Sequence, residues 1–304
     1  MLVTSVVLSV TSSSTRRSVP RFGVYTGPGA SGVAAAKAFA RTTGAPLSQQ
    51  LDFAAADNWD GITGPAWLLD PHAASDLRLE YALPMFPETG GASLAACAGG
   101  RYDAHWAQLA HNLVTAGLAN SVVRPGWEFN GDWYPWAAKD HTRQYVGCFR
   151  HIVTTMRDAS GQRFRFDWNP TVGTGEFPAE EAYPGDAYVD YVGVDAYDTS
   201  SWQQVLDGDH GLQFWSKFAA DHHKPLAIPE WGVAGGGGGR GDDPDYVDRM
   251  FTFMTNAKNH VAYEQYFDVT SSVAAHAIDL GTPFPRSRDA FIDWMRKLTR
   301  SGGA

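Results

Sequence analysis

Short apolar and β-branched runs recur along the chain and alternate with longer stretches that have the spacing of amphipathic helices. Most of these runs are almost continuously apolar, which is typical of parallel strands buried on both faces. Eight of them occur, at residues 21–27, 47–53, 78–86, 121–128, 163–169, 189–197, 225–231 and 261–269. Eight strands that alternate with helices predict an α/β protein built as a single (β/α)8 barrel, the TIM-barrel fold.

The intervening helices have recognisable start and stop signals. The first has Ser31 as a candidate N-cap, an alanine-rich body and Gly44 just past its end. Further helices are expected at about 103–117, 141–158, 202–222, 244–258 and 287–299, whereas Pro and Gly interrupt the second and fifth connections. We therefore expect one barrel domain over residues 21–300.

Both ends of the chain are expected to lie outside this domain. Residues 1–20 contain the apolar run Met1–Val10 without a basic n-region or a clear cleavage signal, so they are expected to be a disordered segment or the remnant of a signal. This interpretation favours a secreted protein. Residues 301–304 are expected to be a loose tail. No window approaches the eighteen apolar residues of a membrane span, and no membrane partner is expected.

Charge and cysteine content narrow the possible partners. The formal net charge of −9 argues against a nucleic-acid partner, which would need a basic face, and fits a neutral polymer or a small molecule better. The cysteines, Cys97 and Cys148, have neither CxxC spacing nor a cluster with histidine, so no metal or other cofactor is expected. They form either a disulfide or two separate buried thiols, and both possibilities remain open. A monomer is expected.

Two glutamates follow apolar strands in strongly aromatic surroundings. Glu128 lies within Arg124–Trp136, and Glu230 lies within Pro225–Val233. Reactive side chains of a (β/α)8 barrel collect at the C-terminal ends of its strands, and these glutamates fall at the ends of predicted strands four and seven. Glycosidic cleavage with retention needs an acid and a nucleophilic carboxylate about 5–5.5 Å apart. We assign Glu128 as the acid/base, with a raised pKa, and Glu230 as the nucleophile.

Three motifs follow one another at the ends of predicted strands four, six and seven: Arg124–Glu128, Gly193–Tyr197 and Glu230. They resemble the motifs of the retaining clan A glycoside hydrolases, and most closely those of glycoside hydrolase family 26. The resemblance extends over the whole barrel. It implies that residues 21–300 form a catalytic domain that cleaves a β-linked polysaccharide internally by double displacement, on β-mannan or on mixed-linkage or β-1,4-glucan.

The resemblance also implies roles for side chains near the two glutamates. Tyr197 would donate a phenolic hydrogen bond to the nucleophile and fix its orientation. Asp195 would be a polar support or a sugar ligand, and Arg124 would point into the barrel and keep neighbouring carboxylates ionised. The alternatives for these three are a core tyrosine, a strand-end cap and a structural ion pair.

One position departs from the family pattern. Trp127 stands immediately before Glu128, where family 26 has His and most other clan A families have Asn. That Asn helps to hold the sugar 2-hydroxyl, an interaction that strengthens in the transition state. In this chain Asn130 and Asn169 are the candidates for that role.

Aromatic side chains cluster at or just beyond the predicted strand ends. Sugar rings pack their apolar C–H faces on aromatic planes, so several binding subsites are expected, although part of the set will pack the rim of the barrel. Asp52 and Tyr266–Asp268 are further candidates for the cleft. The aromatic candidates for substrate binding are Tyr25, Trp127, Trp133, Trp136, Trp168 and Trp231.

Other function classes have less support. The chain has no Gly-x-Ser-x-Gly nucleophile elbow, and the glycines at 27, 29 and 32 lack a phosphate-binding continuation. A carbohydrate-binding barrel without catalysis remains an alternative, and so does an inverting or exo-acting glycosidase on an unusual glycan. A pure lectin has no need of two glutamates at these two strand ends. Neither the polysaccharide nor its linkage follows from the sequence.

Overall fold

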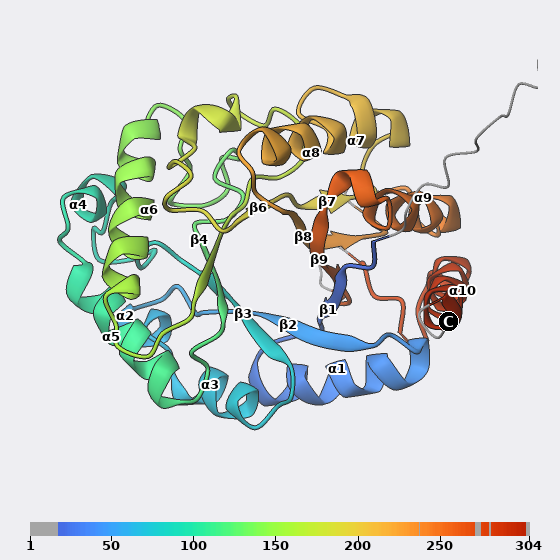
Figure 1. Cartoon of the computed structure of the whole chain (residues 1–304), viewed down its shortest axis with the longest axis horizontal. Coiled ribbons are helices and arrows are strands. Elements are labelled where there is room, and N and C mark those ends of the chain that lie inside the picture. Colours follow the sequence, from blue (N-terminus) through green and yellow to red (C-terminus); the bar gives the residue numbers. More distant parts are fainter. Residues whose placement is uncertain (1–17, 237, 271–274, 280, 302–304) are drawn as a thin grey trace, which may run out of the picture.

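The chain folds into a closed barrel of parallel strands surrounded by helices (Figure 1). The computed structural model describes residues 18–236, 238–270, 275–279 and 281–301. Within these residues the strands follow the order β6-β5-β4-β3-β2-β1-β9-β8-β7, and a pairing of β6 with β8 closes the ring. Since β6 and β7 share one position, the barrel has eight strand positions, and the predicted (β/α)8 fold is confirmed.

The strands coincide with the eight predicted runs, and several are shorter than predicted. The predicted sixth strand, 189–197, is divided because the backbone N–H of Asp195 bonds to the carbonyl of Pro170, whereas the N–H of Val194 bonds to Ala227. The strands are β1 Arg21–Tyr25, β2 Leu47–Phe53, β3 Arg78–Leu83, β4 Val122–Pro125, β5 Arg165–Trp168, β6 Tyr191–Gly193, β7 Ala196–Tyr197, β8 Leu226–Gly232 and β9 Val261–Phe267.

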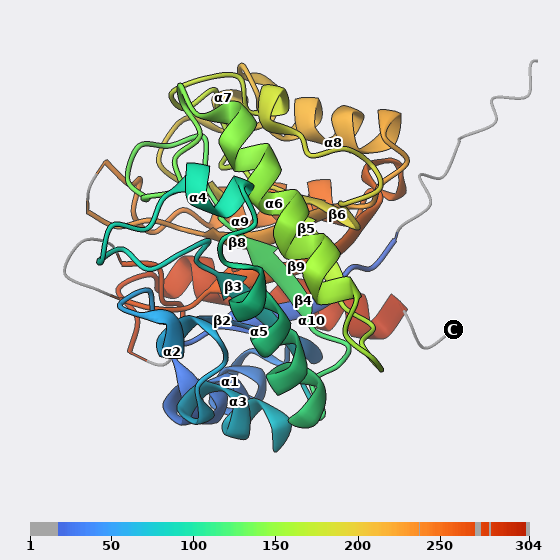
Figure 2. The same cartoon turned by 90° about the vertical axis from the view of Figure 1, so that its left-hand side faces the viewer.

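The helices lie around the outside of the barrel, and Figure 2 shows α5 and α6 crossing the face turned to the viewer. The helices are α1 Gly29–Thr43, α2 Trp59–Ile62, α3 Ala66–Ala73, α4 Leu94–Ala98, α5 Asp103–Thr115, α6 Thr142–Arg157, α7 Trp202–Asp207, α8 Leu212–Asp221, α9 Pro244–Met254 and α10 Pro285–Ser301. Short 3-10 turns occur at Ala179–Ala182 and Ala257–Asn259. In the part of the chain that the structure describes, no helix is long and apolar enough to cross a membrane.

Two details of the predicted helices are wrong. Ser31 is not the N-cap of α1, because the helix begins at Gly29 and the Ser31 hydroxyl donates to the carbonyl of Pro28 within the first turn. The predicted helix 202–222 is two helices, α7 and α8, since the chain turns at 208–211 with His210 in the left-handed region at φ 53°. Gly44 does end α1, with φ 76°.

The predictions for the two chain ends are not tested by the structure. Residues 1–17 and 302–304 lie outside the described residues, and so does most of the segment that the sequence analysis interprets as a signal remnant.

Many side chains inside the barrel are polar, whereas most of those between the strands and the helices are apolar. The inward set lies on neighbouring strands and is fully buried. TIM barrels usually fill this space with branched aliphatic residues, so the polar filling has to satisfy its own hydrogen bonds. Its members are Gln49, Glu80, Arg124, Asp167, Tyr263 and Gln265.

Cys97 on α4 and Cys148 on α6 form a disulfide, which settles the two possibilities that the sequence leaves open. The bridge spans 51 residues and joins α4, which precedes α5, to the long helix α6 after β4. Both cysteines are fully buried, so the bond lies between the two helices and away from solvent.

We expect reduction of this disulfide to destabilise the barrel. Closing a loop of 51 residues removes chain entropy from the unfolded state that corresponds to about 4 kcal/mol, as an upper value. A double Cys97→Ser, Cys148→Ser variant should therefore lose about 2–4 kcal/mol in free energy of unfolding, measured by denaturant titration against the oxidised protein. Equal midpoints for the two proteins would contradict a stabilising role.

Candidate active site

Glu128 lies on a tight turn just beyond β4. The strand ends at Pro125, three residues earlier than predicted, because the backbone N–H of Glu128 leaves the ladder and donates to the carbonyl of Asn169 at 2.7 Å. Gly126 and Glu128 both have left-handed backbones, at φ 56° and 51°. A glutamate in this region is strained, and such strain persists only where surrounding contacts hold it.

The carboxyl of Glu128 is partly buried and has one indole hydrogen bond. Trp133 Nε1 donates to Glu128 Oε2 at 2.9 Å. Burial, and then the charge of Glu230, raise the pKa of Glu128 to about 7, against the smaller opposing effects of Trp133 and Arg124. Glu128 can therefore hold a proton at near-neutral pH, as the sequence analysis expects of the acid/base.

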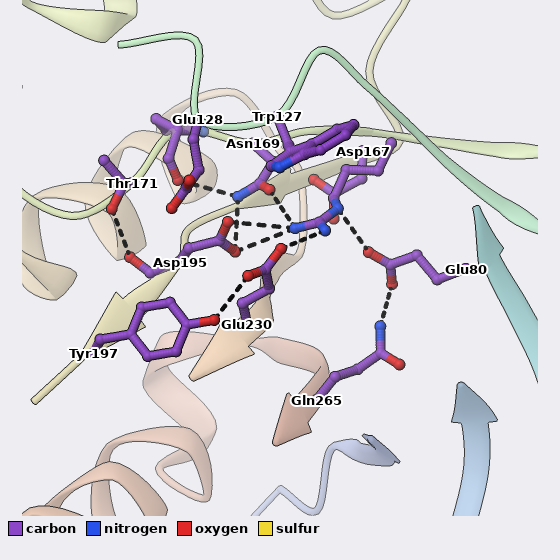
Figure 3. A network of polar contacts seen from close by, with 12 residues as sticks. Glu80, Trp127, Glu128, Asp167, Asn169, Thr171, Asp195, Tyr197, Glu230 and Gln265 are labelled. Carbon is purple, nitrogen blue, oxygen red and sulfur yellow. Dashed lines mark hydrogen bonds and ion pairs between the residues drawn. The ribbon is translucent and has the colours of Figure 1, made fainter. Parts of the chain in front are cut away.

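Glu230 lies on β8 with an exposed fraction of 5%. Arg124 Nη2 donates to its Oε1 at 2.5 Å, and the Tyr197 hydroxyl donates to its Oε2 at 2.7 Å. Figure 3 shows Glu230 beside Tyr197, with a dashed line that joins the two side chains. Burial and the nearby carboxylates raise the pKa of Tyr197 well above its usual value, so the phenol stays a donor. Each Glu230 oxygen has a fixed partner.

Arg124 is the centre of this network. Its guanidinium is fully buried, and Nη1 donates to Asn169 Oδ1 at 2.7 Å and lies 3.3 Å from Asp195 Oδ2. Its Nε lies 3.4 Å from Glu80 Oε1 on β3. Arg124 therefore points into the barrel, as the family resemblance implies, and connects carboxylates from several strands.

Asn169 and Asp195 support Arg124 and are closed off from the cleft. Both side chains are fully buried, and Asn169 Nδ2 donates to Asp195 Oδ1 at 3.2 Å (Figure 3). The buried position does not fit the sugar-binding role considered for Asp195, nor the 2-hydroxyl contact predicted for Asn169.

Asn130 joins two loops and does not face the cleft either. Its Oδ1 accepts from the Thr171 N–H at 2.9 Å, and its Nδ2 donates to the Thr171 carbonyl at 3.0 Å. The side chain is fully buried. Its predicted substrate contact is replaced by a structural one, which ties the turn after β4 to the loop after β5.

Trp168 and Trp231 face away from the cleft. Successive side chains of a strand point to opposite faces, so Trp168 and Trp231 point outward because their neighbours Asp167 and Glu230 point inward. Both rings are fully buried against the helical layer, Trp168 against Trp215 and Trp231 against Phe251. The predicted substrate-binding role is wrong for both residues.

A continuous row of aromatic rings borders the two glutamates. Ring centroids lie 5.0 Å apart for Tyr134 and Trp127, 5.2 Å for Trp127 and Phe53, and 4.9 Å for Phe53 and Tyr25. The row continues from Tyr25 to Phe267 at 4.8 Å and on to Tyr197 at 5.8 Å. We call these six rings the aromatic row. It brings residues of five strands and loops to one surface beside the carboxylates.

The remaining two tryptophans of the predicted set differ in position. Trp136 is fully buried behind the aromatic row, where its Nε1 donates to the Trp127 carbonyl and its ring stacks on Tyr134 at 4.7 Å. Trp133, by contrast, is 54% exposed and contacts Glu128 directly. Trp133 and Tyr25 therefore keep the position expected of sugar-contacting rings, whereas Trp136 supports the row from behind.

Part of the chain is similar in sequence to known proteins. Residues 101–208 match the sequence model of glycosyl hydrolase family 26. The chain is 35% identical over 153 residues to Endoglucanase H of Acetivibrio thermocellus, which covers 46% of this chain and 17% of that protein. The chain is related to glycosyl hydrolase family 26. A mannan endo-1,4-β-mannosidase of Bifidobacterium adolescentis is 29% identical over 128 residues, which is 38% of this chain and 12% of that protein.

Solved structures share the fold over most of the chain. A modular endo-β-1,4-mannanase from Cellulomonas fimi superposes with a TM-score of 0.68 at 18% identity, over 90% of this chain and 70% of that one. A family 26 β-mannanase from Bacteroides ovatus gives 0.63 at 19% identity, over 91% and 88%. At these identities the likeness shows the barrel fold. The chain spans less than a fifth of the length of either curated relative.

Trp127 takes the place of the histidine that the family 26 resemblance predicts. Its exposed fraction is 5%, and the Arg124 guanidinium carbon lies 5.6 Å from the ring centroid. Phe53 flanks the same guanidinium at 5.4 Å. These two rings cover Arg124 and keep water from it, so Trp127 contributes an apolar cover to the charge network and no hydrogen bond to it.

The inner part of the network was not predicted from the sequence. Glu80 Oε2 accepts from Gln49 Nε2 at 2.8 Å and from Gln265 Nε2 at 2.6 Å, and the Tyr263 hydroxyl donates to Asp167. The available signal is a carboxylate within an otherwise apolar buried strand, in Arg-Leu-Glu-Tyr-Ala-Leu and in Arg-Phe-Asp-Trp. Such a residue needs buried partners and therefore marks a network.

The other proposed cleft residues have structural contacts. Asp52 is fully buried and accepts from the Gly29 N–H and from His72. Tyr266 donates to the carbonyl of His276, and Asp268 accepts from the Ile278 N–H. Across the described ranges, no group of three or more His, Cys, Asp or Glu side chains is arranged to hold a metal ion.

The buried carboxylates predict that the barrel loses stability as the pH rises. Burial raises the pKa of Glu80 and of Glu264 to about 8, from about 4.5 in the unfolded chain. The folded state thus retains protons that the unfolded state releases, and the free energy of unfolding falls as pH rises from about 4.5 to about 8. We expect a higher melting temperature at pH 5.5 than at pH 8.5.

A Glu80→Gln variant tests the origin of this dependence. Glutamine imitates the protonated acid, so the variant should lose the part of the pH dependence that Glu80 causes. The difference in unfolding free energy between pH 5.5 and pH 8.5 should shrink by about 1 kcal/mol or more, which is the free energy of a pKa difference a little under one unit. The exposed Glu181→Gln variant is the control and should leave the difference unchanged. An unaltered difference in Glu80→Gln would show that other groups cause it.

Proposed function

We propose that the protein is a glycoside hydrolase that cleaves internal bonds of a β-linked polysaccharide with retention, with Glu128 as acid/base and Glu230 as nucleophile. The observation that carries the proposal is the unequal environment of the two carboxylates. Arg124 and Tyr197 hold Glu230 by a cation and a phenol, whereas Glu128 has one weak donor and a raised pKa. Environments that separate two carboxyl groups in this way assign an acid and a nucleophile.

In the first step Glu128 donates its proton to the glycosidic oxygen while a Glu230 oxygen attacks the anomeric carbon. The glycosidic bond breaks and a glycosyl ester forms on Glu230. Arg124 and Tyr197 fix the direction of attack, because each holds one oxygen of Glu230. In the second step Glu128, now ionised, takes a proton from water, and the resulting hydroxide releases the sugar and restores Glu230.

The proposed substrates are a β-mannan or a mixed-linkage or β-1,4-glucan. The relatives named above comprise an endoglucanase and mannan-cleaving enzymes, which supports both polymers. The aromatic row supports a pyranose chain, since sugar C–H faces pack on aromatic rings. A carbohydrate-binding barrel without catalysis is the alternative that the release of reducing sugar separates from this proposal.

We also infer that the protein works outside the cytoplasm. The Cys97–Cys148 disulfide supports this inference, because structural disulfides persist in oxidising compartments and are rare in the cytosol. Secretion would bring the protein to a polymeric substrate.

Release of reducing sugar from mannan, mixed-linkage glucan, cellulose and xylan tests the reaction. We expect cleavage of mannan or of a glucan, and a loss of at least about 10³-fold in kcat for Glu230→Gln because the variant cannot form the ester. Glu181→Gln is the matched control and should retain activity. Binding without turnover by the wild-type protein would favour a carbohydrate-binding barrel.

The pH profile of kcat/KM tests the role of Glu128. Its alkaline limb should lie near pH 7, where Glu128 loses its proton. The Trp133→Phe variant removes a donor that stabilises the carboxylate, so the alkaline limb should move up by as much as about one pH unit. The acid limb should stay in place. A displaced acid limb with an unmoved alkaline limb would contradict the assignment of the two carboxylates.

A further inference from the structure

Trp67 is an exposed tryptophan far from the glutamates in the sequence and outside the aromatic row. Of the eleven tryptophans, Trp133 and Trp67 are the two that are exposed, and all eleven lie within the described residues. Trp133 contacts Glu128, whereas Trp67 lies on α3 with an exposed fraction of 45%. A single exposed apolar residue needs no explanation by itself, so any role for Trp67 has to follow from its surroundings.

The Trp67 ring lies against the first residue of α1. A Cβ atom at Gly29 would come within 2.7 Å of the Trp67 carbonyl oxygen and 3.0 Å of its ring. Gly29 also has φ 54°, so glycine is required here on both counts. Pro71, four residues after Trp67, has no N–H to donate to that carbonyl, which leaves the carbonyl free to face Gly29. The ring therefore lies closely on the backbone of α1.

A buried hydrogen-bond centre fixes this contact. Asp52 Oδ2 accepts from the Gly29 N–H at 2.8 Å and from His72 Nε2 at 2.9 Å, and all of Asp52 and His72 is buried. One carboxylate thereby joins β2, α1 and α3 directly under Trp67. A ring held this rigidly loses little conformational entropy when a ligand binds on it.

The surface around Trp67 is a shallow depression of about 520 Å³. Pro28, Ala30 and Pro71 are apolar residues of its lining, and Ser31 and Asp70 are polar residues of the same lining. An aromatic plane with a few hydrogen-bonding groups at its border matches the surface of a pyranose, which has apolar C–H faces and hydroxyls around its rim.

The position of Trp67 connects this surface to the cleft. Gly29 follows Tyr25 of the aromatic row by one short loop, and Asp52 precedes Phe53 of the same row. Tyr25 and Phe53 end β1 and β2, so Trp67 lies at the carboxyl-end face of the barrel, where the glutamates also lie. The Trp67 surface and the cleft therefore open on the same end of the barrel.

We propose that Trp67, with Ser31 and Asp70 in the lining of the same depression, is a second carbohydrate-binding surface that holds the same neutral β-linked polysaccharide outside the cleft. This inference rests on the proposed function, since it takes the polymer as the ligand. The surface adds contacts that long chains make and short oligosaccharides do not, and it raises the effective concentration of polymer at the cleft.

The test compares Trp67→Ala with the wild-type protein on polymer and on a trisaccharide. Binding is measured by affinity electrophoresis in mixed-linkage glucan and in mannan, with both proteins carrying Glu230→Gln so that the polymer stays intact. We expect Trp67→Ala to weaken polymer binding about 5- to 10-fold, and Trp67→Phe to weaken it less, because one aromatic plane contributes a contact of this order. In proteins that keep the native Glu230, the kcat/KM of Trp67→Ala on the trisaccharide should stay within about twofold of the wild-type value.

Val19→Ala is the matched control, since Val19 is another exposed apolar residue, at 55%. Melting curves test whether Trp67→Ala is folded. If it unfolds, Trp67→Phe, which keeps an aromatic ring, takes its place in the comparison. Equal polymer binding by all variants, with turnover lost only in Glu230→Gln, would overturn the second surface and leave the proposed function standing. Absence of both cleavage and binding would remove the proposed function first. A dimer that becomes a monomer on Trp67→Ala would identify a second copy as the occupant and overturn the inference.

Discussion

The structure depends on one buried cation. Arg124 is fully enclosed in the barrel, and a buried guanidinium is stable only with charged and hydrogen-bonding partners around it. Those partners come from β3, β8 and the loops after β5 and β6, so the side chains of Glu80, Asp195 and Glu230 are positioned by the same group. Arg124 is one cation among several carboxylates, and its shortest ion pair, at 2.5 Å, is with Glu230. Burial raises the pKa of Glu80 and of Asp195.

Glu128 is positioned by its backbone turn rather than by Arg124. Glu128 reaches the site from a left-handed turn, and the strain of that turn is offset by the contacts of its own loop. Its N–H bonds to the Asn169 carbonyl, Asn130 ties the loop to Thr171, and Trp136 bonds to the Trp127 carbonyl. Polar and aromatic residues that look like sugar ligands in the sequence thus hold Glu128, the proposed acid/base, in place. Trp133 alone of the loop's tryptophans is left to face solvent beside Glu128.

The barrel and its two glutamates are predictable from the sequence because both follow from chain order: eight apolar runs, and motifs that follow their ends. The inward or outward direction of each ring is less accessible. Trp168 and Trp231 could have been excluded by alternation around Asp167 and Glu230. Asn130 and Asn169 could not, because their partners are backbone atoms and a guanidinium contributed by other strands. The division of the sixth strand likewise depends on pairing with residues after β5.

Alternation on β2 relates the two aromatic surfaces to each other. Phe53 points to the cleft, where it flanks Arg124, and Asp52 points outward, where it holds Gly29 and His72 under Trp67. Consecutive residues of one strand therefore set the spacing between the cleft and the proposed second surface, without a flexible linker between them. A fixed spacing raises effective concentration only for a chain whose own geometry spans it. A fixed spacing of this kind makes binding at the second surface depend on the shape of the polymer as well as on the identity of its sugars.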